Sequence, residues 1–292
     1  MNNAKDVRRA KDSQNFLHNK ALVEKLLDIS NITGNDFVIE IGPGKGIITE
    51  ALDKKCKQVI AVEYDEQLYR NLLTKKWRNT RIINADFLSY EFTKGIKVKI
   101  FSNIPFNMTT DIFLKVLKNF EVIEDFYVIM QKEAAERFIG TPYKLESLKS
   151  LLFKPIFSGN IIHEFIKTDF SPIPNVRIVL AHFQKKEYCD IKKAPIIMYW
   201  DMLVYLYNHK GSTFKEKTKD IFSYQQQKRV ANAIKLDMVS PISLWTFEQW
   251  MGIFNCYKQF VPSHKQQQVN GAFKKQDISQ KKLNKVHRSR NY

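Results

Sequence analysis

Residues 37–46 read FVIEIGPGKG, and this stretch decides how the first part of the chain folds. Its apolar beginning, Phe37–Ile41, has the length and composition of a buried strand. The glycines that follow let the backbone turn sharply and approach a ligand closely. A helical pattern follows Gly46, so the turn leads into a helix N-terminus with free N–H groups. The spacing is neither GxGxxG nor GxxxxGK[ST], which disfavours a dinucleotide site and a P-loop.

Strand and helix patterns alternate around this turn. A helix is expected within 17–29. The remaining expected elements, up to residue 139, are strands at 37–41, 59–62, 81–84, 98–101 and 126–130 and helices at 47–52, 68–73, 112–120 and 131–139. Thr109, Thr110 or Asp111 is expected to cap the helix at 112–120. The alternation predicts an α/β fold, with a mostly parallel sheet flanked by helices on both faces.

The residue composition and the hydrophobic pattern change after about Lys186. Two aromatic-rich stretches, 198–207 and 245–254, have a helical pattern and indicate a small all-helical C-terminal domain over 187–261. The stretch 262–292 has few large apolar residues and carries eight Lys or Arg against one Asp, so we expect it to be disordered. Residues 1–14 are expected to be a flexible basic arm in front of a first domain over 1–186.

The whole chain is strongly basic. Its 292 residues carry a formal net charge of +17, with a pI near 9.6. This charge predicts a polyanionic partner, a nucleic acid or the ribosome. No amphipathic basic helix favours a membrane surface, and no secretion signal or spanning run stands out. Three isolated cysteines and scattered histidines predict neither a disulfide framework nor a metal site, which fits a reducing cytoplasm.

Polar residues follow further predicted strands. Glu63 ends the second strand of the alternation, where a carboxylate can accept hydrogen bonds from a ribose diol. Asp86 follows the third and could accept from an adenine amino group, with Phe87 or Leu88 packing on the ring. Each residue alone could equally be an ordinary strand end or turn residue.

Position distinguishes these alternatives. The segment 42–46, Glu63, Asp86 and the segment 103–106 each stand at the carboxyl end of a predicted strand. Because these ends meet at one edge of a parallel sheet, they can share one ligand. The arrangement resembles a class I methyltransferase that uses S-adenosylmethionine (SAM), with Gly42 and Gly44 beside the cofactor.

The segment Asn103-Ile104-Pro105-Phe106 then has a chemical explanation. An exocyclic amino nitrogen is a poor nucleophile because its lone pair is delocalised into the ring. Oxygen acceptors for its N–H groups, on the Asn103 side chain and the Ile104 backbone, would free that lone pair. Pro105 holds Ile104 in an extended conformation, so the oxygens are positioned in advance. Phe106 offers a face on which an unstacked base can lie; the alternative is a structural turn with a core Phe.

Together these residues resemble the erythromycin-resistance (Erm) family of 23S ribosomal RNA adenine N6-methyltransferases. The matching segments, in order, are Ser13–Leu17, Glu40–Gly46, Val62–Glu63, Ala85–Asp86, Asn103–Asn107, Gln131–Ala135 and Phe170–Val176. The resemblance covers about residues 10–185 well and the helical remainder loosely. Two departures are Phe106, where many relatives carry Tyr, and the basic tail after Pro262.

The resemblance implies a role for each site residue. Asn15 and Leu17 would touch SAM from the N-terminal arm, Glu63 would hold the ribose, and Asp86 the adenine. Asn103 would lie at the methyl-transfer point, and the helical domain would bind rRNA. Family members methylate one adenine in the peptidyl-transferase region of 23S rRNA, once or twice. The methyl groups block macrolide, lincosamide and streptogramin B antibiotics, so resistance follows. We expect a cytoplasmic monomer that acts before or during large-subunit assembly.

Three alternatives stay open. The housekeeping small-subunit rRNA dimethyladenosine transferase shares the fold, but it usually shows Asn-Leu-Pro-Tyr-Asn where this chain has Asn103–Asn107. A non-catalytic nucleic-acid-binding factor could retain the fold; the intact Gly42, Glu63, Asp86 and Asn103 argue against it. DNA adenine methylation is the third, because net charge does not separate DNA from RNA.

Overall fold

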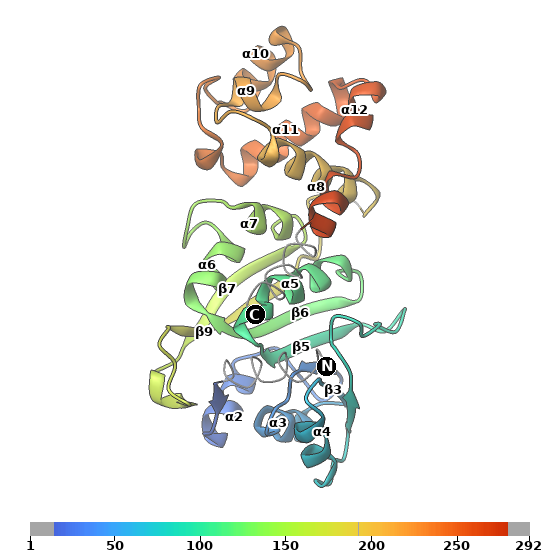
Figure 1. The fold of residues 1–292 in the computed structure, drawn as a ribbon, viewed down its shortest axis with the longest axis vertical. Coiled ribbons are helices and arrows are strands. Elements are labelled where there is room, and N and C mark those ends of the chain that lie inside the picture. Colours follow the sequence, from blue (N-terminus) through green and yellow to red (C-terminus); the bar gives the residue numbers. More distant parts are fainter. Residues whose placement is uncertain (1–14, 192, 280–292) are drawn as a thin grey trace, which may run out of the picture. The chain divides into compact units, whose positions relative to one another are not determined.

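The computed structural model describes residues 15–191 and 193–279. The expected arm at 1–14 and the last residues of the tail therefore lie outside the described residues. The chain folds into two compact units, whose elements are shown in Figure 1. The first consists of the described residues up to Glu136 together with Phe157–Glu187, and the second of Arg137–Ile156 with the described residues from Tyr188 onward.

The first unit contains a seven-stranded mixed sheet in the order β4-β3-β2-β5-β6-β9-β7. Its strands are β2 (Phe37–Ile41), β3 (Gln58–Glu63), β4 (Thr80–Asn84), β5 (Val98–Asn103), β6 (Ile123–Gln131), β7 (Phe157–Glu164) and β9 (Ile178–Lys185). The five strands from β4 to β6 are parallel, whereas β9 is antiparallel to both β6 and β7. The predicted α/β class is confirmed, and the five predicted strands are present, β2 with the predicted bounds and the other four with slightly wider ones.

Helices α3 (Ile47–Lys55), α4 (Glu66–Leu73) and α5 (Thr109–Lys118) connect consecutive parallel strands. Helix α2 (Lys20–Asp28) precedes β2, and α6 (Lys132–Ile139) follows β6 and runs from the first unit into the second. The expectation that Thr109, Thr110 or Asp111 caps α5 was wrong. A 3₁₀ turn (Phe106–Met108) leads directly into α5, so these residues lie in its first turn, and its N-cap Met108 makes no side-chain cap bond.

The central strands are buried on both faces, which explains their continuous apolar runs, whereas β4 and β7 are partly exposed. In β5, every residue from Val98 to Ser102 is buried, and β6 is buried from Asp125 to Met130. The core therefore fixes the sheet and leaves the ends of its strands as the places where polar residues can act.

The second unit is helical. It contains α7 (Leu148–Phe153), α8 (Lys193–Asn208), α9 (Phe214–Thr218), α10 (Tyr224–Ala233), α11 (Phe247–Phe260) and α12 (Ser263–Val269). Capping boxes at Ser223 and Thr246 begin α10 and α11. Trp245 and Trp250 are among its largest buried side chains. In the part of the chain that the structure describes, no helix is both long and apolar enough to cross a bilayer.

The expectation of disorder after Pro262 was wrong for the described residues. Residues 263–269 form α12, and 272–279 form a further helix. Val269 is 1% exposed, so a single apolar residue anchors α12 even though the segment is polar overall. Composition underestimates such a segment, because a few buried contacts to an existing domain can order it.

Candidate active site

The four predicted strand ends lie side by side where the parallel strands reach their carboxyl ends, and we call this row of strand ends the sheet edge. The strands β4, β3, β2 and β5 are adjacent and parallel, so their carboxyl ends stand side by side in that order. Asp86 follows β4, Glu63 ends β3, Gly42 follows β2, and Asn103 ends β5. The register pairs Glu63 with Asn84, and the Asn84 side chain donates to the Glu63 carbonyl over 3.0 Å. The edge thus brings these predicted site residues into one row.

A narrow hollow lies at the β2–β5 part of this edge. Its lining includes Asn15, Leu17, Gly42 and the whole predicted segment Asn103–Phe106. The enclosed space is about 40 Å³, room for only a few water molecules, so a larger ligand would extend along the open edge of the sheet. Gly44, Glu63 and Asp86 do not line this hollow, although they belong to the same edge.

Asn103 is oriented by the N-terminal segment. Its side-chain Nδ2 donates to the backbone carbonyl of Asn15 over 2.7 Å. Among the residues that the structure describes, none donates to Asn103 Oδ1 or to the carbonyl oxygen of Ile104. Pro105 adopts φ −62° and ψ 125°, an extended geometry that ends the strand without closing a turn over these oxygens. At the end of β5, Asn103 Oδ1 and the Ile104 carbonyl oxygen are therefore both able to accept a hydrogen bond.

Phe106 is half-buried and belongs to both the core and the hollow. It packs against the core cluster of the first unit and also lines the hollow beside Asn103. The Phe106 carbonyl accepts from the hydroxyl of Thr109 at 2.9 Å, which ties the segment to α5. The aromatic side chain is consequently held in position next to the two acceptors.

The glycine-rich turn offers a close backbone approach. Gly42 has φ +62°, and a Cβ there would meet nothing within 4 Å, so open space borders the backbone. Gly44 has φ +58°, and a Cβ there would come within 2.6 Å of the Phe16 ring. Both positions require glycine, the first for backbone conformation and the second also for contact with the N-terminal segment.

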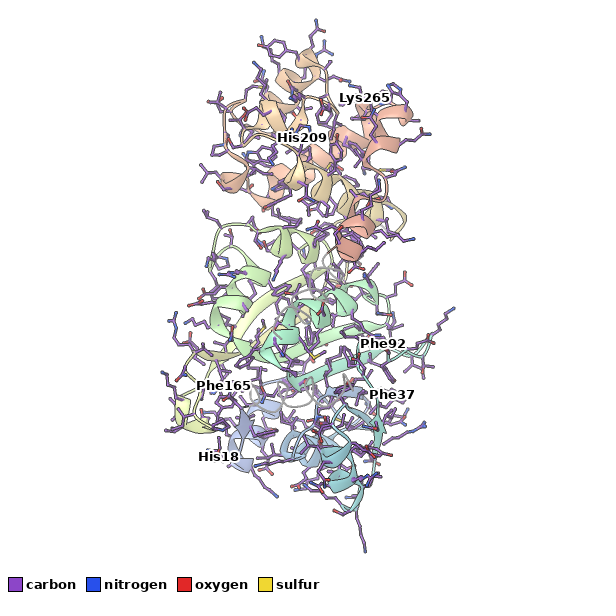
Figure 2. The ribbon with its side chains drawn as sticks, in the orientation of Figure 1. His18, Phe37, Phe92, Phe165, His209 and Lys265 are labelled. Atoms are coloured by element: carbon purple, nitrogen blue, oxygen red, sulfur yellow. The ribbon has the colours of Figure 1, made fainter. Side chains whose placement is uncertain are left out.

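A short strand holds that N-terminal segment in place. Strand β1 (Phe16–Leu17) pairs with β8 (Phe170–Ser171), which explains why the sequence carries motifs at both places. His18 Nε2 lies 2.8 Å from the Thr168 carbonyl oxygen (His18 is labelled in Figure 2). The ammonium group of Lys45 lies 5.2 Å from the centre of the Phe16 ring. Sequence analysis assigned no role to Phe16, although it lies between two predicted ligand residues.

Two buried carboxyl groups belong to the site. Glu63 is 2% exposed; its Oε2 accepts from the Gly44 N–H over 3.0 Å, and its Oε1 from the Asp65 N–H over 2.9 Å. Burial raises the pKa of Glu63, although these two donors oppose the shift. Each carboxylate oxygen keeps a second lone pair for a further donor, such as a hydroxyl.

Glu40 is the second buried acid, and sequence analysis gave it no role. It lines the hollow, is 1% exposed, and accepts from the Thr49 hydroxyl over 2.6 Å. Burial raises the pKa of Glu40 to about 8, and the nearby charge of Glu63 adds to the shift. A charged residue inside the apolar run Val38–Ile41 was the signal that could have identified it.

Asp86 has a structural role as well as its place at the edge. Its Oδ1 accepts from the Leu88 N–H over 2.8 Å and so holds its own turn. Of the two residues suggested to pack on a ligand ring, Phe87 is 4% exposed and stacks on Tyr90 at 6.4 Å. Leu88, the other candidate, is half-buried.

The edge fits SAM by the chemistry of its residues. SAM carries positive charge on its sulfonium and amino groups, and hydroxyl donors on its ribose. The buried carboxyl groups of Glu40 and Glu63 offer oxygen acceptors to its hydroxyl and amino donors. The open space beside Gly42 admits a ligand close to the backbone. Among residues 15–191 and 193–279, no group of three His, Cys, Asp or Glu side chains could hold a metal ion.

Comparisons with known proteins agree with this geometry. The family model described as "Ribosomal RNA adenine dimethylase" matches residues 5–259. An "rRNA adenine N-6-methyltransferase" of Bacillus anthracis is 30% identical over 261 residues, 88% of this chain and 90% of the relative. A "Ribosomal RNA small subunit methyltransferase A" of Mycoplasmopsis pulmonis is 32% identical over 216 residues, 73% of this chain and 84% of the relative.

Solved structures share the fold. The 23S rRNA methyltransferase ErmE superposes with a TM-score of 0.72 at 20% identity, covering 84% of this chain and all of that chain. A dimethyladenosine transferase from Plasmodium falciparum superposes with a TM-score of 0.60, covering 80% and 86%. The predicted resemblance is confirmed at the level of the family and the fold. The chain belongs to the ribosomal RNA adenine dimethylase family.

Proposed function

We propose that the protein transfers methyl groups from SAM to N6 of one adenine in 23S rRNA, giving N6-methyl- or N6,N6-dimethyladenine. The observation that supports this most directly is the orientation of Asn103. Because its Nδ2 already donates to the Asn15 carbonyl, its Oδ1 is the end of the amide left to accept from a substrate. An adenine amino group has two N–H donors, and the Asn103 Oδ1 and Ile104 carbonyl provide two acceptors.

Each residue of the segment 103–106 is assigned a separate role toward the target adenine. The two oxygens accept from the N6 hydrogens and turn the nitrogen lone pair out of conjugation with the ring. Phe106 stacks on the extruded base, and its π-face stabilises the positive charge that develops on N6. Pro105 keeps the acceptors in place before the base arrives. When bound, SAM supplies an electrophilic methyl group on a sulfonium sulfur.

The cofactor is assigned to the rest of the edge. We assign the backbone of Gly42 and Gly44 to its amino-acid part and Glu63 to its ribose. Asp86 accepts from its adenine amino group, and Asn103 also touches the cofactor at the transfer point. Asn15 and Leu17 close the site from the N-terminal segment, which β8 holds in place.

The substrate and location follow from charge and from the relatives. A net charge of +17 favours a nucleic-acid partner, and the names of the relatives favour RNA. The relative from Bacillus anthracis carries the name of an rRNA adenine N-6-methyltransferase. We infer that a cytoplasmic monomer acts on 23S rRNA before or during large-subunit assembly, with the helical domain (187–261) binding the RNA. Macrolide, lincosamide and streptogramin B resistance would follow.

A second candidate substrate is small-subunit rRNA. The relative from Mycoplasmopsis pulmonis, named for that activity, is also similar over most of this chain. Ile104 favours the 23S substrate, since the small-subunit enzymes usually show Leu at this place. A non-catalytic binding factor would have no need for the acceptors at Asn103 and Ile104.

Expression in a susceptible bacterium tests the proposal. We expect resistance to macrolides and lincosamides, together with a reverse-transcriptase stop at one adenine of the 23S peptidyl-transferase loop. The Asn103→Ala variant should give neither. A stop in 16S rRNA without resistance would replace the proposal with the second candidate.

A further inference from the structure

The segment beyond residue 259 lies outside the family match, yet part of it is docked onto α8. The backbone N–H groups of Gly271 and Phe273 donate to the two carboxylate oxygens of Asp201, over 2.8 and 2.9 Å. Asp201 is 5% exposed, so its charge is buried at the N-terminus of the helix at 272–279. The Phe273 ring packs against Trp200 at 5.1 Å. These contacts fix the position of that helix.

The docked helix completes a cavity in the second unit. The cavity measures about 680 Å³ and lies between the end of α8, the segment 209–220 and the helix at 272–279. His209 is labelled in Figure 2. The lining residues that matter here are Tyr205, His209, Lys210, Lys219, Lys275 and Gln276. Because two of these come from the extension, the family-matched part of the chain does not form the cavity alone.

Positive charge dominates the cavity. Lys210, Lys219 and Lys275 face a single carboxylate, that of Asp220. Within the described ranges, none of the three ammonium groups forms an ion pair with a carboxylate. Asp220 is already engaged, since its Oδ2 lies 2.6 Å from His209 Nε2. The cavity therefore favours an anionic ligand, and a phosphate group suits several separate ammonium donors.

His209 engages the acidic group of the cavity. Its Nδ1 lies 2.9 Å from the Lys210 carbonyl oxygen, and its Nε2 lies 2.6 Å from Asp220 Oδ2. The His209 side chain is 12% exposed, whereas that of Asp220 is 49% exposed. One oxygen of the single carboxylate in the lining therefore already has a partner within the protein.

Gln276 indicates a second chemical feature of the ligand. Its Oε1 is buried and has no hydrogen-bond partner in the part of the chain that the structure describes. A buried acceptor without a donor is costly, so a ligand that supplies one is favoured. A phosphate diester has no donor, whereas a ribose 2′-hydroxyl has one. Phosphate and hydroxyl occur together in a ribonucleotide.

We propose that this cavity binds one nucleotide of the RNA substrate away from the target adenine. Lys219, Lys275 and Lys210 hold the phosphate, and the Gln276 side chain turns its enclosed Oε1 toward the cavity to accept from the 2′-hydroxyl. The proposal rests on the proposed function, because the RNA substrate supplies the nucleotide. The proposal assigns a function to the segment beyond residue 259: Asp201 positions the helix at 272–279, which completes the RNA contact.

The test uses the full chain and measures RNA affinity. The double variant Lys219→Glu/Lys275→Glu should bind a 23S peptidyl-transferase-loop transcript at least tenfold more weakly. The slope of log affinity against log salt should fall by about 1.4, at roughly 0.7 for each lost contact to single-stranded RNA. SAM affinity should not change. The matched control is Lys228→Glu/Lys258→Glu, which reverses two exposed lysines of α10 and α11 outside the cavity.

Equal weakening by both double variants would overturn the proposal, because diffuse charge would then explain binding. Unchanged affinity of the cavity variant would also overturn it. The assay reads binding, so it remains informative even if no methyl group is transferred to 23S rRNA. That failure would count against the proposed function alone.

Two further arms identify the ligand. Gln276→Leu should reduce the preference for RNA over DNA of the same sequence several-fold, since only RNA carries the 2′-hydroxyl; an unchanged preference would remove Gln276 from the proposal. AMP and inorganic phosphate are titrated against the wild-type chain by calorimetry. If AMP binds at micromolar concentration and the lysine variant keeps its RNA affinity, the cavity is a site for free nucleotides and the proposal fails.

Discussion

The sheet edge of the first unit and the basic cavity of the second differ in the chemical groups that they present. The edge presents acceptor oxygens and the buried Glu40 around a space of about 40 Å³, with the buried Glu63 further along the same edge. The cavity presents lysines around about 680 Å³. Every residue of the edge lies inside the family match, whereas part of the cavity lies beyond it. The proposed methyl-transfer residues thus lie inside the family match, and one proposed RNA contact lies partly beyond it.

Replacing Asn103 should cause the largest loss of methyl transfer among the substitutions at the sheet edge. Asn103→Ala removes one N6 acceptor and the bond to the Asn15 carbonyl. We expect methyl transfer at saturating substrate to fall at least about 10²–10³-fold, the cost of losing one preorganised polar group at a reacting centre. Affinity for RNA and SAM should stay largely intact, as measured by filter binding and calorimetry.

Asn71→Ala on the exposed face of α4 is the matched control and should leave transfer unchanged. If Asn103→Ala weakens SAM binding as much as it slows transfer, Asn103 is part of the cofactor site alone.

Gly44→Ala should damage the edge through the N-terminal segment. The new Cβ would sit at φ +58° and 2.6 Å from the Phe16 ring, so this segment must move. We expect SAM affinity to fall about tenfold or more, or about 1.4 kcal/mol, measured by calorimetry. Gly95→Ala is the control, since Gly95 has φ +79° but open space around its Cβ. It should cost stability without changing SAM affinity; similar losses in both variants would point to backbone strain alone.

Two substitutions of Phe106 distinguish the effect of base stacking on methyl transfer from the effect of a phenolic hydroxyl group. Phe106→Tyr keeps the aromatic face, and we expect transfer within about threefold of wild type. Phe106→Ala removes base stacking, worth about 1–3 kcal/mol, so kcat/KM for RNA should fall by about tenfold or more. Steady-state kinetics with a short RNA hairpin measures both. Equal activity of the Ala and Tyr variants would assign Phe106 to the core only.

The prediction for Glu40 concerns stability against pH and not methyl transfer. Its folded pKa of about 8 lies above the ordinary carboxyl value of 4.5. Between these values the unfolded chain is ionised and the folded chain is protonated, so this group lowers stability as pH rises. The slope is about 1.4 kcal/mol per pH unit, and it ends above pH 8.

Glu40→Gln removes that titration and should gain stability relative to wild type between pH 5 and pH 8. Urea unfolding at several pH values measures the difference between the two proteins, which cancels the other titrating groups. A constant difference across this range would mean that Glu40 is ionised in the folded protein.

The sequence predicted which residues lie at the sheet edge better than it predicted the helices after Pro262. Gly42, Glu63, Asp86 and Asn103 each follow an apolar strand, and parallel order alone brings strand ends together. Glu40 was missed because a residue inside a strand gives no positional signal beyond its charge. Sequence also did not predict that Asp201 would anchor the extension, since that bond depends on a distant backbone N–H group.

The measurement that tests the central claim most directly is methyl transfer in vitro from labelled SAM to 23S and 16S rRNA offered together. Asn103→Ala is run in parallel, and the labelled nucleosides are identified after digestion. The account predicts label only in 23S rRNA, as N6-methylated adenine at one position, and none with the variant. Label in 16S rRNA alone, label on another atom, or undiminished transfer by Asn103→Ala would contradict it.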